Sequence, residues 1–236
     1  DFDSINQNPN LPVDVTTYGL FNNANKQLTD GTRAGFSSGR MALPWVQYSA
    51  QRTYTNEDRF QFRQETNTAF YTDLFTAAQN YKTIIELCTD PERSAQVVLY
   101  GNINNQIAAS RIMLSVTFLH LVDAYGDVPY YSYGNDDPDF QALQLRQTGN
   151  TLPKFASQEK IYADIMKELK EASEMIEDGE IIFTRGDGLF GGTDKMKRFA
   201  NSLRLRVANR VKGIVPGAEE QIADAIASGV MQSNDD

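Results

Sequence analysis

Side chains that commonly carry out chemistry are scarce in this sequence. Its 236 residues include one cysteine, Cys88, and one histidine, His120. A single cysteine cannot form a disulfide within these residues, and one His with one Cys supplies too few ligands for a zinc site. We predict that Cys88 is a small packed side chain. His120 lies in an apolar stretch without a neighbouring nucleophile, so a buried histidine is favoured over a general base, and we expect neither catalysis nor a cofactor or metal.

Basic residues and long apolar runs are also scarce. The chain has 22 Lys and Arg against 31 Asp and Glu, which gives a formal charge of −9. This balance argues against nucleic-acid and anionic-membrane partners. There is no uninterrupted run of 18 apolar residues, so no segment is predicted to span a bilayer. The chain begins at Asp1 rather than Met and shows no signal peptide, from which we expect a processed or trimmed protein.

The apolar residues that are present recur mostly with the spacing of helices, and they make up 41% of the chain together with Cys. No long alternating stretch favours a sheet, and only Ile181–Thr184 is weakly suggestive of a strand. Helices paired along the chain predict an all-α array of hairpins like a tetratricopeptide stack, although no 34-residue repeat is visible. The predicted helices cover 15–28, 38–53, 66–89, 93–125, 157–178, 195–212 and 217–228, and the irregular segments cover 54–65, 126–156 and 179–194.

The longest predicted helix, 93–125, has apolar residues on more than one side and should be buried on more than one face. Gly126 follows it where a helix needs a residue with positive φ, which glycine reaches without a Cβ clash. Pro129 then prevents the helix from resuming. We predict that Gly126 ends this helix with positive φ and that Asp127 bonds its own backbone in the turn.

The predicted helices 157–178 and 195–212 carry opposite charges. Each has an apolar stripe, which includes Ile165 and Leu169 in the first and Leu203 and Val207 in the second. We predict that they form an antiparallel hairpin with these stripes in contact. The charges would lie on the outer faces and neutralise each other, which is favoured over a nucleic-acid site on a single basic helix. The charged residues are Glu159, Asp164, Glu168, Glu171, Glu174 and Glu177 in the first helix and Arg198, Arg204, Arg206 and Arg210 in the second.

Four segments resemble, in the same order, motifs of one family. They are residues 1–10 ("DFDxINxNPN"), 123–130 ("YGDVPY"), 157–169 ("SQExIYxxIxxxL") and 197–210 ("KxFANSLRLRxAxR"). The sequence is identified as a member of the SusD/RagB group of nutrient-binding outer-membrane lipoproteins, in its SusD-like branch. One departure is Met196, where a Trp is expected, which removes one possible aromatic surface.

The resemblance implies a fold, a length and a function. Residues 1–236 would be the N-terminal, tetratricopeptide-like half of a longer protein whose C-terminal half is absent here. The whole protein would bind oligosaccharide at the cell surface, perform no chemistry, and deliver its ligand to a TonB-dependent SusC-like transporter in the outer membrane. A lipidated Cys upstream of Asp1 would provide its only membrane attachment.

Aromatic residues are concentrated in one part of the chain, with eight between Trp45 and Phe75. Tyr54, Phe60 and Phe62 lie in a polar connection together with Arg59. An exposed ring beside such polar groups suits sugar recognition, because the ring covers the apolar C–H face while the polar groups bind hydroxyls. We therefore predict a ligand-binding site at Tyr54, Arg59, Phe60 and Phe62. The alternative is that these rings pack onto the scaffold. A weaker second candidate comprises Tyr130, Tyr131 and Tyr133.

Two other functions stay open at the level of sequence. A helical-repeat module could bind a peptide or protein in an apolar groove. A glycosidase would need two carboxylates facing each other across a cleft. A pair can always be chosen from 31 acidic residues, so the presence of such pairs in the sequence is not evidence for this function. The acidic loop Asn135–Asp139 could conceivably bind calcium, but its spacing differs from that of the twelve-residue calcium loop.

Overall fold

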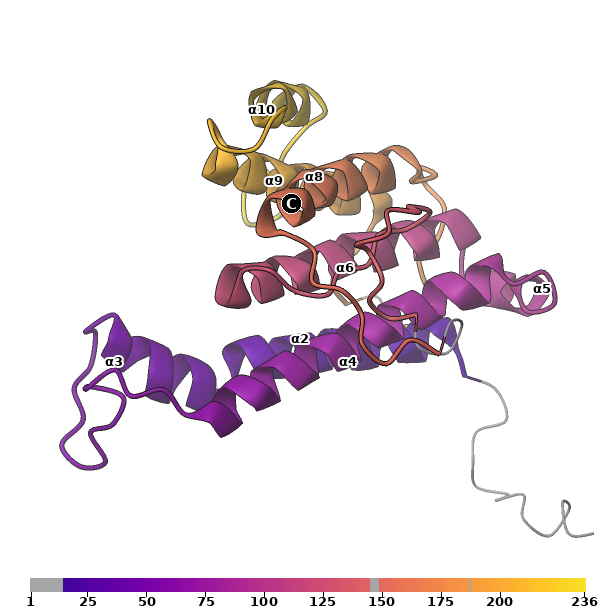
Figure 1. Cartoon of the computed structure of the whole chain (residues 1–236). Helices are drawn as coiled ribbons and strands as arrows, with labels where there is room; N and C mark the ends of the chain where they lie inside the picture. The colour runs from indigo at the N-terminus through magenta and orange to yellow at the C-terminus, as the bar shows by residue number, and fades with distance from the viewer. Residues whose placement is uncertain (1–14, 145–148, 187) are drawn as a thin grey trace, which may run out of the picture.

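The computed structural model describes residues 15–144, 149–186 and 188–236 (Figure 1). It is a stack of helices, as predicted, and the described residues contain no strand beyond a single bridge between Val128 and Ala156. The main helices are α2 (Thr17–Arg33), α4 (Gln64–Thr89), α6 (Ile103–Tyr125), α8 (Gln158–Glu174), α9 (Thr193–Val211) and α10 (Ala218–Ala227). Shorter elements are the π-helix η1 (Gly35–Ala42), α3 (Leu43–Trp45), α5 (Ser94–Val97) and the 3-10 turn η2 (Val98–Tyr100).

Each main helix packs against the next one along the chain, and neighbouring helices run antiparallel (Figure 1). The contacts show the direction, because residues late in one helix meet residues early in its neighbour. This arrangement is the hairpin array that the sequence predicts. Pairs that show this are Gly31–Asp73 for α2 and α4, Asn67–Tyr125 for α4 and α6, Asp123–Tyr162 for α6 and α8, and Lys212–Glu219 for α9 and α10.

The predicted hairpin of α8 and α9 is confirmed. Lys197 near the start of α9 lies 2.6 Å from Asp178, which follows the end of α8. Arg210 near the end of α9 shares Asp123 with Tyr162 from the first turns of α8. The two helices therefore run antiparallel and in contact. In the stripes between them, Ile165, Leu169 and Val207 are buried, while Leu203 is half-buried at the edge of the core.

α6 lies at the centre of the stack, and both of its predicted apolar sides are covered by α4 and α8. It is long and apolar enough to cross a membrane, yet most of it is buried within the protein, which is the setting of a core helix. Asn102 caps its first turn by accepting the Asn105 N–H at 3.0 Å. Cys88 is buried nearby as predicted, and burial raises the pKa of its thiol to about 12.

The prediction of one continuous helix over 93–125 is wrong. The helix is interrupted at Gly101, where the backbone takes φ +142°. A Cβ on Gly101 would lie 2.2 Å from the Ile182 carbonyl oxygen, so the segment 181–184 approaches too closely for any other residue. That segment is not the suggested strand. It is held by two backbone bonds, from Asn102 N–H to Ile181 and from Thr184 N–H to Tyr100, both at 2.8 Å.

The predicted helix 38–53 is also wrong in part. Helical structure begins at Gly35 and ends at Trp45. Gln47 has φ +62°, which is incompatible with a continuing helix. Residues 46–50 are exposed, so continuing the helix would bury no further apolar surface. The chain instead leaves the stack as a loop that returns at the start of α4.

The prediction that the acidic residues of α8 lie on its outer face is wrong for Glu168 and Asp164. Glu168 and Asp164 are 4% and 6% exposed, because α6 and the segment after it cover the side of α8 that a two-helix hairpin would leave open. Glu168 forms a two-pronged ion pair with Arg111 of α6, at 2.8 Å to Nη2 and 3.0 Å to Nε. Asp164 accepts the Tyr130 hydroxyl at 2.9 Å. The α8 carboxylates are therefore neutralised chiefly by α6 and by neighbouring lysines, rather than by α9.

Arg204 likewise lies inside the protein and not on an outer face of α9. It is 1% exposed because α10 covers it. Its Nη1 is 2.8 Å from Asp224 of α10, while Nε and Nη2 are buried without a hydrogen-bond partner among the described residues. Arg204 thus joins α9 to α10.

The turn at Gly126 matches its prediction. Gly126 has φ +76° and ψ −122°, and its N–H donates to the Val122 carbonyl at 3.0 Å. Asp127 does not bond its own backbone as predicted. It accepts the Gln158 N–H at 2.8 Å and so links the turn to the first residue of α8.

We expect Gly126→Val to lower the free energy of unfolding by about 1–2 kcal/mol, since a β-branched residue fits this backbone conformation poorly. A Cβ at Gly126 meets no atom within 4 Å, so the cost comes from the backbone alone. Urea unfolding measures it. Gly39→Val is the matched control, because Gly39 has neither positive φ nor a close neighbour. Equal stability of both variants and the wild type would contradict the prediction.

We expect Arg111→Met to destabilise the protein by about 3 kcal/mol or more, because Glu168 keeps a buried charge without its main partner. The double variant Arg111→Met/Glu168→Leu should recover most of this loss, since no charge is then left unpaired. Lys26→Met is the control, because Lys26 pairs with Asp30 on the open surface and should contribute under about 1 kcal/mol. Urea unfolding that shows Arg111→Met to be as mild as Lys26→Met would refute this.

Candidate functional site

Residues 43–63 extend beyond the helix stack at the end where α3 is labelled in Figure 1, and we call them the aromatic projection. Four of its rings are largely open to solvent: Tyr48 is 84% exposed, Tyr54 79%, Phe62 71% and Phe60 53%. Most aromatic residues of the stack are instead packed in or against the core. The predicted alternative, in which these rings fold onto the scaffold, therefore does not describe Tyr54, Phe60 or Phe62.

The backbone of the projection is strained where it presents its rings. Of the four non-glycine residues with positive φ in the described chain, Gln47, Tyr54 and Phe60 lie here. Positive φ at a residue with a side chain costs of order 1–3 kcal/mol and persists only where the surroundings hold it in place. The loop is closed by short bonds, which include Gln51 N–H to Asp58 at 2.6 Å and Phe60 N–H to Glu57 at 2.9 Å.

Two of the predicted site residues border hollows in the surface. Phe60 and Tyr48 line one of about 310 Å³, beside Asp58. Phe62 lines a second hollow of about 350 Å³, where Trp45 packs edge-on against it with ring centres 5.0 Å apart. Tyr54 and Arg59 are exposed and do not line these hollows. The structure thus places Phe60 and Phe62 beside cavities and leaves Tyr54 and Arg59 in the open.

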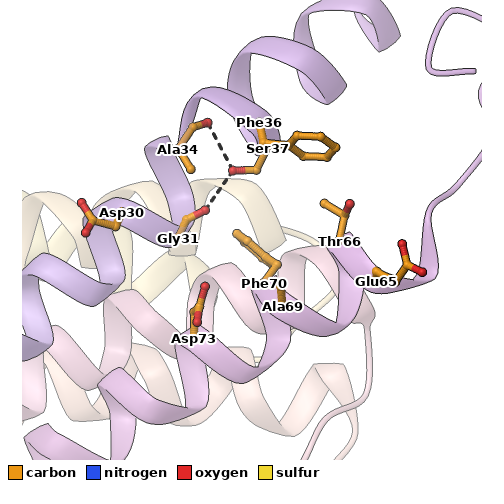
Figure 2. Close-up of a pocket in the computed structure, with 10 residues that line it drawn as sticks. All are labelled: Asp30, Gly31, Ala34, Phe36, Ser37, Glu65, Thr66, Ala69, Phe70 and Asp73. Atoms are coloured by element: carbon orange, nitrogen blue, oxygen red, sulfur yellow. Dashed lines mark hydrogen bonds between the residues drawn. The ribbon is translucent and has the colours of Figure 1, made fainter. Parts of the chain in front are cut away.

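A groove follows the first turns of α4, and we call it the α4 groove. One part, of about 340 Å³, lies between the end of α2, η1 and α4 (Figure 2). Phe36 and Phe70 supply its rings, and Ser37 donates to the Gly31 and Ala34 carbonyls at its edge. The part beside Phe62 shares Ser37, Thr66 and Phe70 with it, so the two are continuous. Each hollow is near the lower end of the size usual for ligand sites.

The charges of the two regions differ. The α4 groove is bordered by the carboxylates of Asp30, Glu65 and Asp73 (Figure 2). Of these, Asp30 pairs with Lys26. The projection instead exposes Arg52 and Arg59. Both regions combine flat rings with hydroxyl, amide or charged groups, which is the composition that a polar, partly apolar ligand requires.

The other sequence candidates are occupied by structural contacts. Tyr130 is buried against Asp164, and the guanidinium of Arg111 lies 4.7 Å from the centre of the Tyr133 ring. The second candidate site is therefore not a free aromatic surface. In the acidic loop, Lys160 lies 2.6 Å from Asp139, and this bond lowers the pKa of Asp139. Within residues 15–144, 149–186 and 188–236, no group of three or more His, Cys, Asp or Glu is placed to hold a metal.

Several residues of the site were missed in the sequence. Trp45 and Tyr48 belong to the aromatic-rich stretch, and this enrichment could have indicated them as site residues. They were instead expected in the predicted helix 38–53. The sequence contains no pattern that predicts the α4 groove, because the residues of its walls lie about 35 positions apart, such as Asp30 and Glu65. Only the packing of α2 against α4 brings them together.

Comparison with known proteins identifies the class to which this architecture belongs. The SusD-like family described as "Starch-binding associating with outer membrane" matches residues 9–236. The chain is therefore a member of this SusD-like family. A comparison with curated proteins finds no match.

Solved structures share the fold. A "chitin-binding protein" is 25% identical with a TM-score of 0.71, and the match covers 93% of this chain and 44% of that one. A protein named "Bacteroidetes AC2a SusD-like" is 24% identical with a TM-score of 0.65, covering 93% and 38%. A SusD homolog from Bacteroides fragilis NCTC 9343 is 18% identical with a TM-score of 0.59, covering 94% and 42%. The chain thus spans less than half the length of these structures. The TM-scores confirm the helical, tetratricopeptide-like fold predicted for it.

Proposed function

We propose that residues 1–236 are the N-terminal helical part of a longer cell-surface protein that binds oligosaccharide. The observation that carries this proposal is the set of exposed rings on the aromatic projection, next to the α4 groove. The starch-binding description of the family and the similarity to a chitin-binding protein support a glycan as the ligand.

The geometry suits recognition by stacking. A ring of the projection would cover the apolar C–H face of a sugar, and polar side chains beside Phe62, such as Thr66 and Asn67, would bind hydroxyls. Each sugar unit contributes little by itself. Affinity would then come from several units bound at once along the projection and the α4 groove, because linked contacts raise the effective concentration.

The proposal includes a place in the cell and a partner. The family description associates its members with the outer membrane. We infer a protein anchored there by a lipid, which passes its ligand to a TonB-dependent SusC-like transporter and performs no chemistry. The family is described as starch-binding and the similar solved protein as chitin-binding, with no reaction named for either, which supports a binding protein over a glycosidase.

A peptide ligand is the second candidate, and the α4 groove favours it. Phe36 and Phe70 line that groove together with three carboxylates, which would suit a peptide with basic and apolar side chains. Such a ligand would use the groove, which includes Phe62, and would not use Tyr54 or Phe60. The variants Tyr54→Ala and Phe60→Ala therefore separate the two candidates.

We expect Tyr54→Ala, Phe60→Ala and Phe62→Ala each to weaken binding of the cognate glycan about ten- to thirtyfold, or about 1–2 kcal/mol, because a stacked ring is lost. The measurement is calorimetry on the full-length protein, after a glycan-array screen has named the ligand. Phe155→Ala is the matched control, since Phe155 is 65% exposed but lies outside the projection.

The three variants should keep the melting temperature of the wild type, because their rings are exposed and contribute little to the core. If all three fold normally and bind glycan as the wild type does, the site lies elsewhere in the protein. If no glycan binds but a basic peptide does, the α4 groove becomes the site.

A further inference from the structure

Glu57 is the one charged residue of the aromatic projection that is fully covered, with 0% of its surface exposed. Its Oε1 accepts a bond from Arg63 Nε at 2.7 Å and lies 3.6 Å from Arg40 Nε. Burial alone would raise the pKa of Glu57, but its polar contacts, which include the bond from Arg63, outweigh this and lower it. Two arginines therefore face a carboxylate that the loop encloses.

These contacts join three separate pieces of chain. Arg40 belongs to η1, which precedes the projection, and Arg63 is the residue before α4. Gln51 stands on the outgoing arm of the loop, and its N–H binds Asp58 beside Glu57. Glu57 thus connects the two ends of the projection, and Asp58 beside it bonds the outgoing arm.

The projection has little else to hold it. Its large apolar side chains are mostly exposed, so it has no hydrophobic core of its own. Its interior is polar, and Glu57 Oε2, Gln51 Oε1 and Trp45 Nε1 are all buried without a hydrogen-bond partner among the described residues. Buried polar clusters of this kind hold a single conformation only while their remaining bonds stay intact.

The rings that we assign to ligand binding depend on that conformation. Tyr54 and Phe60 have φ values of +58° and +56°, and both lie within three residues of Glu57. A loop released from its ion pairs would relax toward ordinary backbone angles, which would turn both rings away from their present positions.

We propose that Glu57 is the positioning residue of the binding site, holding the aromatic projection in the shape that presents its rings to ligand. It contacts Arg40 and Arg63 and does not itself touch ligand. The inference rests on the proposed function for its biological meaning. Whether Glu57 holds the projection in shape can be measured without any ligand.

The test is Glu57→Gln in the full-length protein, because glutamine keeps the shape and removes the charge. Trypsin can cut after the exposed Arg52 and Arg59, and the cleavage sites are mapped by mass spectrometry. We expect cleavage there to become about tenfold faster, since proteolysis follows the population of opened loop. Hydrogen exchange should quicken in peptides covering 46–63 and stay unchanged in those covering α6.

Three companion variants make the result specific. Glu92→Gln makes the same chemical change at an exposed position outside the projection and should behave as the wild type. Arg63→Gln should reproduce the effect of Glu57→Gln. The double variant Glu57→Gln/Arg63→Gln should be no worse than either single one, because both changes remove the same ion pair.

Glycan affinity is the further readout, and we expect Glu57→Gln to weaken it about tenfold with every ring still present. The proposal is overturned if trypsin cleavage and exchange over 46–63 match the wild type, or if exchange rises equally in α6. It is also overturned if the loop opens while glycan affinity is unchanged. Should the wild type bind no glycan at all, the proposed function fails, while the ligand-free experiments still decide whether Glu57 holds the projection.

Discussion

The buried ion pair between Arg111 and Glu168 is the interaction on which the rest of the structure depends. It joins α6 to α8 at the centre of the stack, where both side chains are about 4% exposed. Burying two charges is costly, and the geometry offsets the cost because both prongs of the guanidinium are used and Glu171 lies 2.6 Å away. Ser132 and Tyr133, from the segment after Gly126, pack on the same pair, so that segment is fixed by it too.

The aromatic projection follows a different principle from the stack. The stack is held by apolar surface buried between consecutive helices, and its rings are mostly packed within it. The projection exposes its rings and is held by a small polar cluster around Glu57. A binding surface of flat exposed rings needs such an arrangement, because rings buried to stabilise a loop are no longer available to a ligand. The same physical difference separates Tyr54 and Phe60 from Tyr130, which looks similar in sequence but is a core residue.

Much of the fold was accessible from the sequence, and so was part of the site. Helical spacing gave the hairpin of α8 and α9, and Gly126 with Pro129 gave the end of α6, because these are local consequences of side-chain period and backbone freedom. The density of aromatic residues indicated the projection. Two features came only from the packing of distant segments. One is the position of Phe60 and Phe62 beside hollows, and the other is the α4 groove between Asp30 and Glu65.

What the sequence by itself determined is therefore the fold class, most of the helices and the family. What only the tertiary structure decided is which charges are buried. Arg204, Asp164, Glu168 and Glu57 look like ordinary surface charges in a linear pattern, yet all four are at most 6% exposed. Periodicity reports the face of a helix that meets its first neighbour, while burial on the remaining faces depends on a third element that arrives from elsewhere in the chain. For Arg204 that element is α10, for Glu168 it is α6, and for Glu57 it is the loop that closes around it.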